Sequence, residues 1–376
     1  MRASSAALLE VRIERLASGG DGVARVASGE AAGLVVFVPY AAPGDLLRVR
    51  LVERRKRFAR AEIVELLEAG PQRRDPACRL YGRCGGCDWM HLTEDAQSDA
   101  RAELLRDALQ RIGRFEGLPA VQRLGSPAPL GYRARARVAV VPGAIGFRAR
   151  ASDAIVDVPE CPVLDPDAAR ALEDLRARPP RPVAEVELRG SEATATGLRV
   201  SPRSFFQANA SLWQSWPERV VALCGSGELA VELYAGVGFL TVELQKAYAR
   251  VIAVEVAASV DDLRENTRAE VFAESASEFA ALRLGALQPE LVLLNPPRTG
   301  CGTDVAHAIR DARPQRVVYV SCDPPTLARD CAVLRDDYDL VALLSIDALP
   351  QTHHVEGVVV LERRARELPS TCTALA

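Results

Sequence analysis

Between about residues 217 and 365, short apolar runs alternate with stretches of helical periodicity, and this alternation constrains the fold more than any other feature. Runs such as RVIAVEVA, ELVLLNPP and RVVYVSC indicate buried strands, and DDLRENTRAEV and LARDCAVLRD indicate helices between them. Strands that alternate with helices form α/β domains around a mainly parallel sheet. The sequence therefore predicts an α/β, Rossmann-like domain over residues 201–376.

The preceding residues predict two smaller β-rich units. Residues 1–66 contain alternating strands and turns rich in Gly and Pro, which is typical of a small β-barrel. Residues 67–200 hold four of the nine cysteines, an amphipathic helix over about 94–115 and a second β-rich stretch. With 376 residues, the chain has room for three such domains.

Composition excludes several classes of protein. Hydrophobic residues make up 48% and charged residues 26%, which excludes wholesale disorder. No apolar run reaches the roughly 18–20 residues of a membrane helix, and the N-terminus lacks the apolar segment of a signal peptide. An odd number of cysteines fits a reducing cytoplasm better than a disulfide framework. We therefore expect a cytoplasmic, monomeric protein with no membrane partner.

The net charge of −3 hides two local basic segments. Residues 48–60 carry seven Lys and Arg against one Glu, and residues 131–150 hold five arginines and no acidic residue. A patch of one sign on a small β domain can bind RNA phosphates, and a solvated strand face is the alternative interpretation. The candidate phosphate contacts are Arg54, Arg55 and Arg57.

A Gly-rich turn follows a predicted strand in ELAVELYAGVGFLTVELQ. Gly236 and Gly238 let the backbone turn tightly and approach a ligand. A dinucleotide site would place a third glycine at position 241, which is Thr, so NAD is disfavoured. The next strand ends at Glu255, where a carboxylate can bind ribose hydroxyls. This combination favours S-adenosylmethionine (SAM), and a plain strand–turn–helix connection is the alternative.

Two further loops follow predicted strands, where open α/β sheets bind their ligands. One contains Asn295, two prolines and Arg298, and the other contains Cys322 and Asp323. A helix is predicted to start directly after Cys322, and its dipole can lower the pKa of the thiol. We interpret Cys322 as a candidate nucleophile, although a lone cysteine is more often a small buried hydrophobe.

Together these motifs resemble the RNA 5-methyluridine (uracil-C5) methyltransferases, specifically the class with a TRAM domain and a [4Fe–4S] cluster, such as 23S rRNA uridine-C5 methyltransferases. The resemblance runs along nearly the whole chain. Its motifs are Cys78-x5-Cys84-Gly-Gly-Cys87, Cys161 in ECPVL, SFFQAN (204–209), LYAGVGF (233–239), NPPR (295–298), SCDP (321–324) and HHVE (353–356). It implies a SAM-dependent methyltransferase domain behind a TRAM-like, OB-like RNA-binding barrel and a central iron–sulfur domain.

The resemblance implies a specific reaction. Cys322 would add to C6 of a uridine, C5 would then take the methyl group of SAM, and Glu356 would remove the C5 proton. The substrate would be structured RNA, with rRNA favoured over tRNA. An RNA-binding protein with a decayed methyltransferase site is the alternative from another class, and retention of Cys322 and Glu356 argues against it.

The resemblance also implies further contacts to the cofactor and the RNA. For SAM they are Gln207, Tyr234, Gly236, Gly238, Phe239, Glu255 and Asn295. Phe239 lacks a polar side chain for such a contact. For the RNA they are Phe205, Arg298 and Asp323. Phe205 would stack on an extruded uridine, and core packing is the alternative for this side chain.

By the same resemblance, four cysteines are ligands of a [4Fe–4S] cluster: Cys78, Cys84, Cys87 and Cys161. Spacing alone leaves zinc open, because structural zinc also takes four cysteines, though commonly in two short-spaced pairs. We expect the cluster to be structural, since methyl transfer to uracil needs no electron transfer.

The chain departs from the family pattern in two places. Asn295 stands where the family usually has Asp, and Asp323 stands where it usually has Asn. If these side chains lie close together, the exchange keeps one carboxylate and one amide in the site. The segment between Glu255 and Asn295 is short, and FAESASEFAAL shows no obvious acidic contact for adenine. We therefore expect weaker SAM binding or a different adenine contact.

Overall fold

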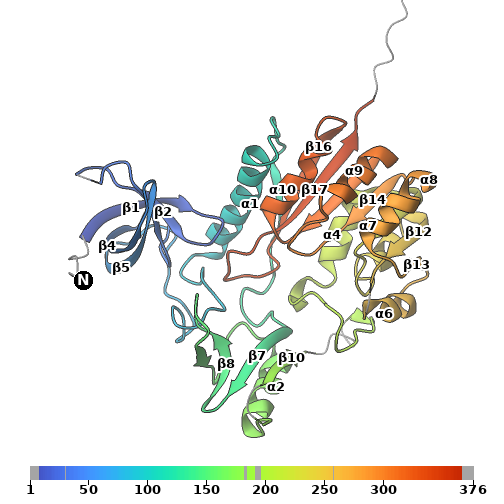
Figure 1. The fold of residues 1–376 in the computed structure, drawn as a ribbon. Coiled ribbons are helices and arrows are strands. Elements are labelled where there is room, and N and C mark those ends of the chain that lie inside the picture. Colours follow the sequence, from blue (N-terminus) through green and yellow to red (C-terminus); the bar gives the residue numbers. More distant parts are fainter. Residues whose placement is uncertain (1–7, 30, 182–183, 191–195, 257, 366–376) are drawn as a thin grey trace, which may run out of the picture.

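Three β-sheets organise the protein, and each belongs to a different unit of the chain (Figure 1). The computed structural model describes residues 8–29, 31–181, 184–190, 196–256 and 258–365. Within these ranges, no helix has the length and apolar character that a membrane span requires.

The N-terminal unit is a closed barrel with the strand order β1-β2-β3-β5-β4. Its strands are β1 (Leu8–Leu16), β2 (Gly22–Arg25), β3 (Val35–Val38), β4 (Leu46–Arg54) and β5 (Phe58–Glu68). Alternate residues point inward, so that Val11, Ile13 and Val49 are buried and their neighbours face solvent. The predicted small barrel is confirmed.

The central unit is an antiparallel sheet in the order β10-β7-β8-β9, covered by one helix. The elements are β7 (Arg135–Val141), β8 (Ala144–Arg148), β9 (Ile155–Asp157), α2 (Pro166–Ala177) and β10 (Ala184–Arg189). Asp165 caps α2 by accepting a hydrogen bond from Ala168 N at 2.7 Å. The cysteine-rich loop lies against this sheet, where Gly85 N donates to Arg148 O at 2.9 Å.

The C-terminal unit is an eight-stranded sheet in the order β13-β12-β11-β14-β15-β17-β16-β6. Its strands are β6 (Val121–Leu124), β11 (Gly227–Leu233), β12 (Tyr248–Val254), β13 (Glu270–Phe272), β14 (Leu291–Leu294), β15 (Arg316–Ser321), β16 (Tyr338–Ile346) and β17 (Glu356–Arg363). Strands β11 to β15 pair in parallel, and β17 runs antiparallel to both neighbours. The predicted α/β domain with a mainly parallel sheet is confirmed.

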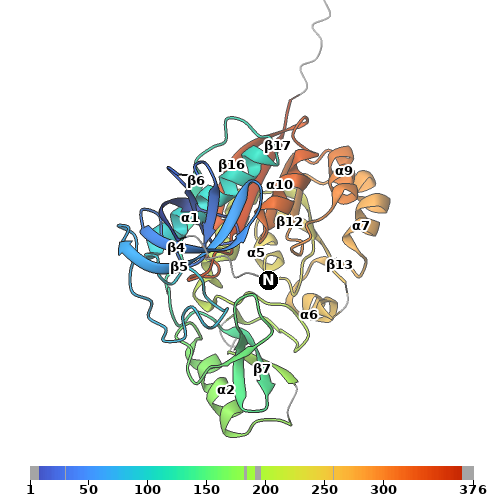
Figure 2. The same cartoon turned by 60° about the vertical axis from the view of Figure 1, so that its left-hand side comes forward.

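Helices cover both faces of this sheet (Figures 1 and 2). They are α4 (Ser215–Cys224), α5 (Thr241–Leu244), α6 (Ser259–Asn266), α7 (Ala276–Phe279), α8 (Gly285–Leu287), α9 (Thr303–Ala312) and α10 (Pro324–Ala332). Because both faces are covered, all four residues of β14 are buried. This explains why the strands appear in the sequence as continuous apolar runs rather than alternating ones.

Helix α1 (Glu94–Arg111) packs on the eight-stranded sheet and β6 is one of its strands, although both precede the central unit in the chain. The helix buries Leu105 and Leu109 in the same core as Tyr338 and Leu343. Strand β6 pairs in parallel with β16 at the sheet edge. The sequence analysis placed both in the central segment, because proximity in sequence does not show which sheet completes a core.

A buried polar network joins α1 to the loop that precedes Glu356. Arg101 is 1% exposed, and it donates to Asp347 Oδ1 at 3.0 Å and to Thr352 O at 2.9 Å. Gln97, one turn earlier, accepts from Gln351 N at 2.8 Å. Two side chains of α1 therefore hold the loop before Glu356 in place.

Replacing Arg101 with Met should lower the free energy of unfolding of the catalytic domain by about 3–5 kcal/mol, because Asp347 would lose its buried partner. Urea unfolding followed by tryptophan fluorescence measures this loss. Arg111→Met is the matched control, since Arg111 lies on the same helix and its side chain is exposed. Equal unfolding midpoints for the two variants would contradict the prediction.

Candidate functional site

Cys322 and Glu356 come together because the strands that carry them are paired. Cys322 follows β15 and Glu356 starts β17, and Ser321 lies opposite Gly357 in the antiparallel ladder. Cys322 lines a cavity of about 480 Å³ together with Arg298 and the loop before Glu356. The other walls come from residues 15–19 of the barrel and from α1. The cavity therefore lies where the barrel, α1 and the eight-stranded sheet meet.

Burial raises the pKa of both reactive groups. Glu356 is 9% exposed, and burial raises its pKa to about 8. Burial, followed by the charge of Glu356, raises the pKa of Cys322 to about 11. The positive charge of Arg298 lowers the pKa of both groups without cancelling the effect of burial. In the free protein, burial and the charge of Glu356 therefore raise the pKa of Cys322, and the opposing effect expected from the dipole of α10 stays a prediction.

Asp323 has a structural partner of its own. It caps α10, and its Oδ1 accepts a hydrogen bond from Thr326 N at 2.9 Å. Asp and Asn are nearly equivalent caps, so either residue satisfies this helix end. Asn295 directly follows β14, and within the described ranges no hydrogen bond joins its side chain to Asp323. Capping of α10 thus explains the exchange at position 323 without a hydrogen bond to Asn295.

The Gly-rich loop lies at the end of β11, next to the ends of β12 and β14. Tyr234 and Gly238 have positive φ angles of 63° and 94°. A Cβ at Gly238 would lie 2.6 Å from Thr267 Cγ2, so only glycine fits there. Glu255 Oε2 accepts a hydrogen bond from Gly236 N at 2.7 Å. Glu255, which is predicted to bind ribose hydroxyls, therefore also stabilises the conformation of the Gly-rich loop.

Glu232 is a buried carboxylate that the sequence analysis missed. It lies on β11, is 1% exposed, and its Oε2 has no hydrogen-bond partner within the described ranges. Burial, together with the charge of Glu255, raises its pKa to about 8. A single acidic residue inside the apolar run LAVELYA was the available signal. Glu232 is a potential acceptor directly below the Gly-rich loop.

The two phenylalanines of the SFFQAN segment differ in burial. Phe205 is 73% exposed, which excludes core packing as its role. Phe206 is 3% exposed, and its ring lies 5.4 Å from the rings of Trp213 and Phe239. Phe239 is thereby committed to aromatic packing. Gln207 is half-buried, and its backbone carbonyl accepts a hydrogen bond from Trp213 Nε1 at 2.9 Å.

The segment after β13 satisfies its acidic residues locally. Ser275 and Glu278 form a capping box at the start of α7, and Glu274 pairs with Arg283 at 2.7 Å. Both carboxylates therefore have protein partners. This agrees with the absence of an obvious acidic adenine contact in the sequence.

The four motif cysteines line a single cavity of about 170 Å³. Burial raises the pKa of Cys87 to about 12 and also raises the pKa values of Cys84 and Cys161, and charges on neighbouring thiols add to each shift. Arg133 lines the same cavity and lowers the pKa of Cys84 and Cys87. Across the described ranges, however, no set of three or more His, Cys, Asp or Glu side chains is arranged to hold a metal ion.

Ion pairs neutralise several arginines of the basic segment of the barrel (residues 48–60). Arg48 pairs with Glu10 on β1, Arg50 pairs with Glu62 on β5, and Arg55 pairs with Glu53 at 2.6 Å. The antiparallel neighbours β1 and β5 bring Glu10 and Glu62 alongside β4, which a count along one strand does not show. Arg54 and Arg57 remain exposed at the tip between β4 and β5.

Asp88 is a further residue that the sequence analysis missed. It lies next to Cys87, and its carboxylate accepts from His353 N at 3.0 Å and contacts His353 Nδ1. Gly20 of the barrel packs on this pair, since a Cβ there would lie 2.7 Å from Asp88 Oδ2. Trp89 Nε1 also donates to Gly20 O at 2.9 Å. All three units therefore meet at the edge of the catalytic cavity, and no sequence motif marks Asp88.

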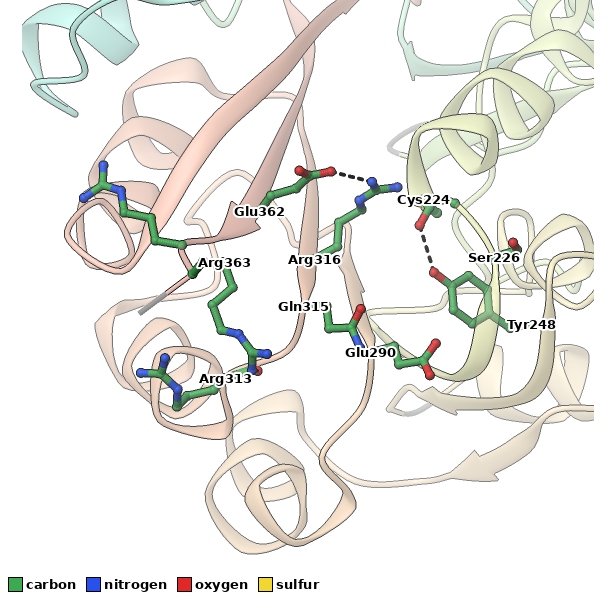
Figure 3. Close-up of a pocket in the computed structure, with 12 residues that line it drawn as sticks. Cys224, Ser226, Tyr248, Glu290, Arg313, Gln315, Arg316, Glu362 and Arg363 are labelled. Carbon is green, nitrogen blue, oxygen red and sulfur yellow. Dashed lines mark hydrogen bonds and ion pairs between the residues drawn. The ribbon is translucent and has the colours of Figure 1, made fainter. Parts of the chain in front are cut away.

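A second cavity, with a volume of about 800 Å³, lies at the opposite end of the eight-stranded sheet (Figure 3). It is lined where β11, β12 and β15 begin, away from the carboxyl ends that carry Cys322. Arg316 pairs there with Glu362 at 2.5 Å and Arg364 with Asp339 at 2.7 Å. Because its lining includes neither Cys322 nor the loop before Glu356, this cavity is not the candidate site.

Replacing Glu356 with Gln should lower the pKa of Cys322 below about 11, because the substitution removes the carboxylate that opposes thiolate formation. The pH dependence of iodoacetamide alkylation at Cys322, resolved by peptide mass spectrometry, gives this pKa without RNA or cofactor. Glu362→Gln, at the far end of the same strand, should leave it unchanged. An unchanged or higher pKa in Glu356→Gln would contradict the assignment.

Comparison with known proteins confirms the resemblance. Residues 265–364 match the family model described as tRNA (Uracil-5-)-methyltransferase, and residues 7–64 match the TRAM domain. The chain is 32% identical to the 23S rRNA (uracil(1939)-C(5))-methyltransferase RlmD of Halomonas elongata, with 94% of this chain and 89% of that protein covered. It is 30% identical to an uncharacterized RNA methyltransferase of Synechocystis, with 94% and 96% covered.

A solved structure shares the fold. The tRNA (uracil-54, C5)-methyltransferase of Pyrococcus abyssi, in complex with S-adenosyl-L-homocysteine, superimposes with a TM-score of 0.71 at 23% identity. The match covers 94% of this chain and 99% of that one. On the strength of the family match and of these relatives, the chain belongs to the RNA uracil-C5 methyltransferases that carry an N-terminal TRAM domain.

Proposed function

We propose that the protein transfers the methyl group of SAM to C5 of a uridine in structured RNA through a covalent adduct of Cys322. The observation that carries this proposal is the pairing of β15 with β17, which places the buried carboxylate of Glu356 near the thiol of Cys322, and this thiol lines the cavity. A thiol to activate the ring and a base to release it are the two groups that this chemistry requires.

The steps follow from the properties of the ring. The thiolate of Cys322 bonds to C6, and the electron pair of the 5,6 double bond makes C5 nucleophilic. C5 then takes the electrophilic methyl group of SAM, whose carbon–sulfur bond breaks and leaves S-adenosylhomocysteine. Glu356 removes the C5 proton, and elimination breaks the bond between C6 and sulfur and releases the Cys322 thiolate. Arg298 assists because its charge favours both the thiolate and the carboxylate.

We propose that Gln207, Tyr234, the Gly-rich loop, Glu255 and Asn295 hold SAM at the ends of β11, β12 and β14. The relation of Glu255 to Gly236 supports this assignment, since a ribose would meet a carboxylate already oriented by the loop. Phe239 is better explained as packing, because its ring lies between the loop and Phe206.

The RNA would enter between the barrel and the catalytic sheet. Arg54 and Arg57 are exposed for phosphate contacts, whereas Arg55 is paired with Glu53 and contributes less. Phe205 offers an exposed ring on which an extruded uridine can stack. We propose rRNA rather than tRNA as the substrate, which the 32% identity to an rRNA enzyme over most of both chains supports.

RNA containing 5-fluorouridine should form a stable adduct with the protein, because fluorine at C5 cannot leave as a proton. Cys322→Ala should form no adduct, and Cys224→Ala, a buried thiol on α4, should form it normally. Adducts are detected as shifted bands in denaturing gels, with 23S rRNA and tRNA transcripts compared. The absence of an adduct with either RNA would exclude the reaction, and an adduct with tRNA alone would overturn the choice of rRNA.

We also propose that Cys78, Cys84, Cys87 and Cys161 hold a [4Fe–4S] cluster. Their convergence on one largely apolar cavity supports this, because such a cluster is held by four thiolates in an environment shielded from solvent. In such a cluster the four cysteines would each supply one thiolate ligand to iron, whereas in a structural zinc site all four would bind a single ion. The cluster would join the loop of Cys78–Cys87 to the segment of Cys161, and binding would release the thiol protons.

Protein purified without oxygen should contain iron and inorganic sulfide in about equal amounts, near four of each per chain. Cys87→Ser should lose both, whereas Cys224→Ser should retain them. Elemental analysis and sulfide determination measure the two contents. Zinc in place of iron, without sulfide, would contradict the proposal.

A further inference from the structure

We infer that Asp330 is a positioning residue for the reaction: it fastens the loop of residues 295–302 to helix α10 and so places Arg298 at the cavity beside Cys322. The inference rests on the proposed function, since it concerns the same reactive groups. Asp330 itself lies behind the cavity wall and touches neither the RNA nor SAM.

The contacts of Asp330 converge on backbone groups of this loop. Its side chain is fully buried, and Oδ2 accepts from Cys301 N at 2.8 Å and from Gly302 N at 3.3 Å. The same oxygen accepts from Tyr319 Oη at 2.8 Å. Tyr319 lies on β15, three residues before Cys322. One carboxylate therefore joins the strand that leads to the nucleophile with the loop that carries Arg298.

Two more residues of α10 complete the fastening. Asp330 Oδ1 holds the Arg329 guanidinium at 2.7 Å, and Arg329 Nη2 donates to Thr299 O at 2.9 Å. Thr326 Oγ1 donates to Arg298 O at 3.1 Å. Side chains of helix α10 thus form hydrogen bonds with four of the five residues from 298 to 302.

Gly300 is the fifth, and its geometry explains why the approach is so close. Its φ of +79° is one that other residues rarely adopt. A Cβ at this position would collide with Asp330 Oδ2 and with Arg329 Nη2. The glycine therefore lets the loop backbone lie directly on the carboxylate.

The position of Arg298 matters because few charges face the nucleophile. Cys322 is faced by Glu356 on β17, Arg298 on the loop and Asp323 at the start of α10. Of these, only Arg298 favours the thiolate. Asp330 is itself surrounded by Arg329, Tyr319, Cys301 and Tyr234. A loop released from α10 would move the positive charge of Arg298 away from the thiol.

Asp330→Asn tests this inference, because asparagine has one acceptor oxygen and no charge, and cannot hold the loop amides and Arg329 together. The rate of iodoacetamide alkylation at Cys322 is measured against pH without RNA or SAM. We expect about tenfold slower alkylation at pH 8, equivalent to a rise of about one unit in the thiol pKa. Asp311→Asn, which removes an exposed carboxylate on neighbouring α9, is the matched control.

A double-mutant cycle separates positioning from general loosening of the domain. Arg298→Ala should slow alkylation similarly, and adding Asp330→Asn to it should slow it no further. An unchanged rate in Asp330→Asn, or full additivity in the double variant, would overturn the inference. Should Asp330→Asn fail to fold, Thr326→Val decides: slower alkylation supports the inference and an unchanged rate overturns it. Failure of the 5-fluorouridine adduct would instead refute the proposed reaction and leave this measurement intact.

Discussion

The catalytic loop depends on Gln351, a fully buried residue whose backbone is in the left-handed region at φ 68°. That conformation costs about 1–2 kcal/mol for a residue with a side chain. Its carbonyl accepts from Trp89 N at 3.0 Å, its Oε1 from Arg74 Nη2 at 3.0 Å, and its Nε2 donates to Pro129 O at 3.0 Å. At about 1 kcal/mol each, these bonds offset the strain. They tie the loop before Glu356 to the cysteine-rich segment and to the region after β6.

Much of the fold could be predicted from local patterns. Strand β14 is a continuous apolar run because helices cover both of its faces, and β1 alternates because one face lines the barrel core. The placement of α1 and β6 could not be predicted, because an amphipathic helix shows that it has a partner and not which sheet provides it. The pairing of Arg48 with Glu10 is hidden for the same reason, since the residues are neighbours only across β1 and β4.

The residues of the candidate site also differ in whether the sequence alone could predict them. Cys322 and the Gly-rich loop could be predicted because their chemistry requires particular residue types at strand ends, whereas Glu356 was predicted only from the family resemblance. The pKa of Cys322 was not foreseen, since it depends on burial and on a carboxylate 34 positions away. Asp88 and Asp330 were missed because each acts through backbone contacts that any short acceptor could make. Motifs reveal the reacting groups, and the groups that place them emerge only from packing.

The meeting of Gly20, Asp88 and His353 has a consequence for the order in which the enzyme is made. Gly20 and His353 are separated by 333 residues, so the ribosome delivers one wall of the cavity long before the opposite wall. Contacts of such long sequence separation form late, after the local barrel and helices. Until β17 has been synthesised, the thiol has no carboxylate partner and no enclosing cavity. A growing chain therefore exposes no competent active site before β17 joins the sheet.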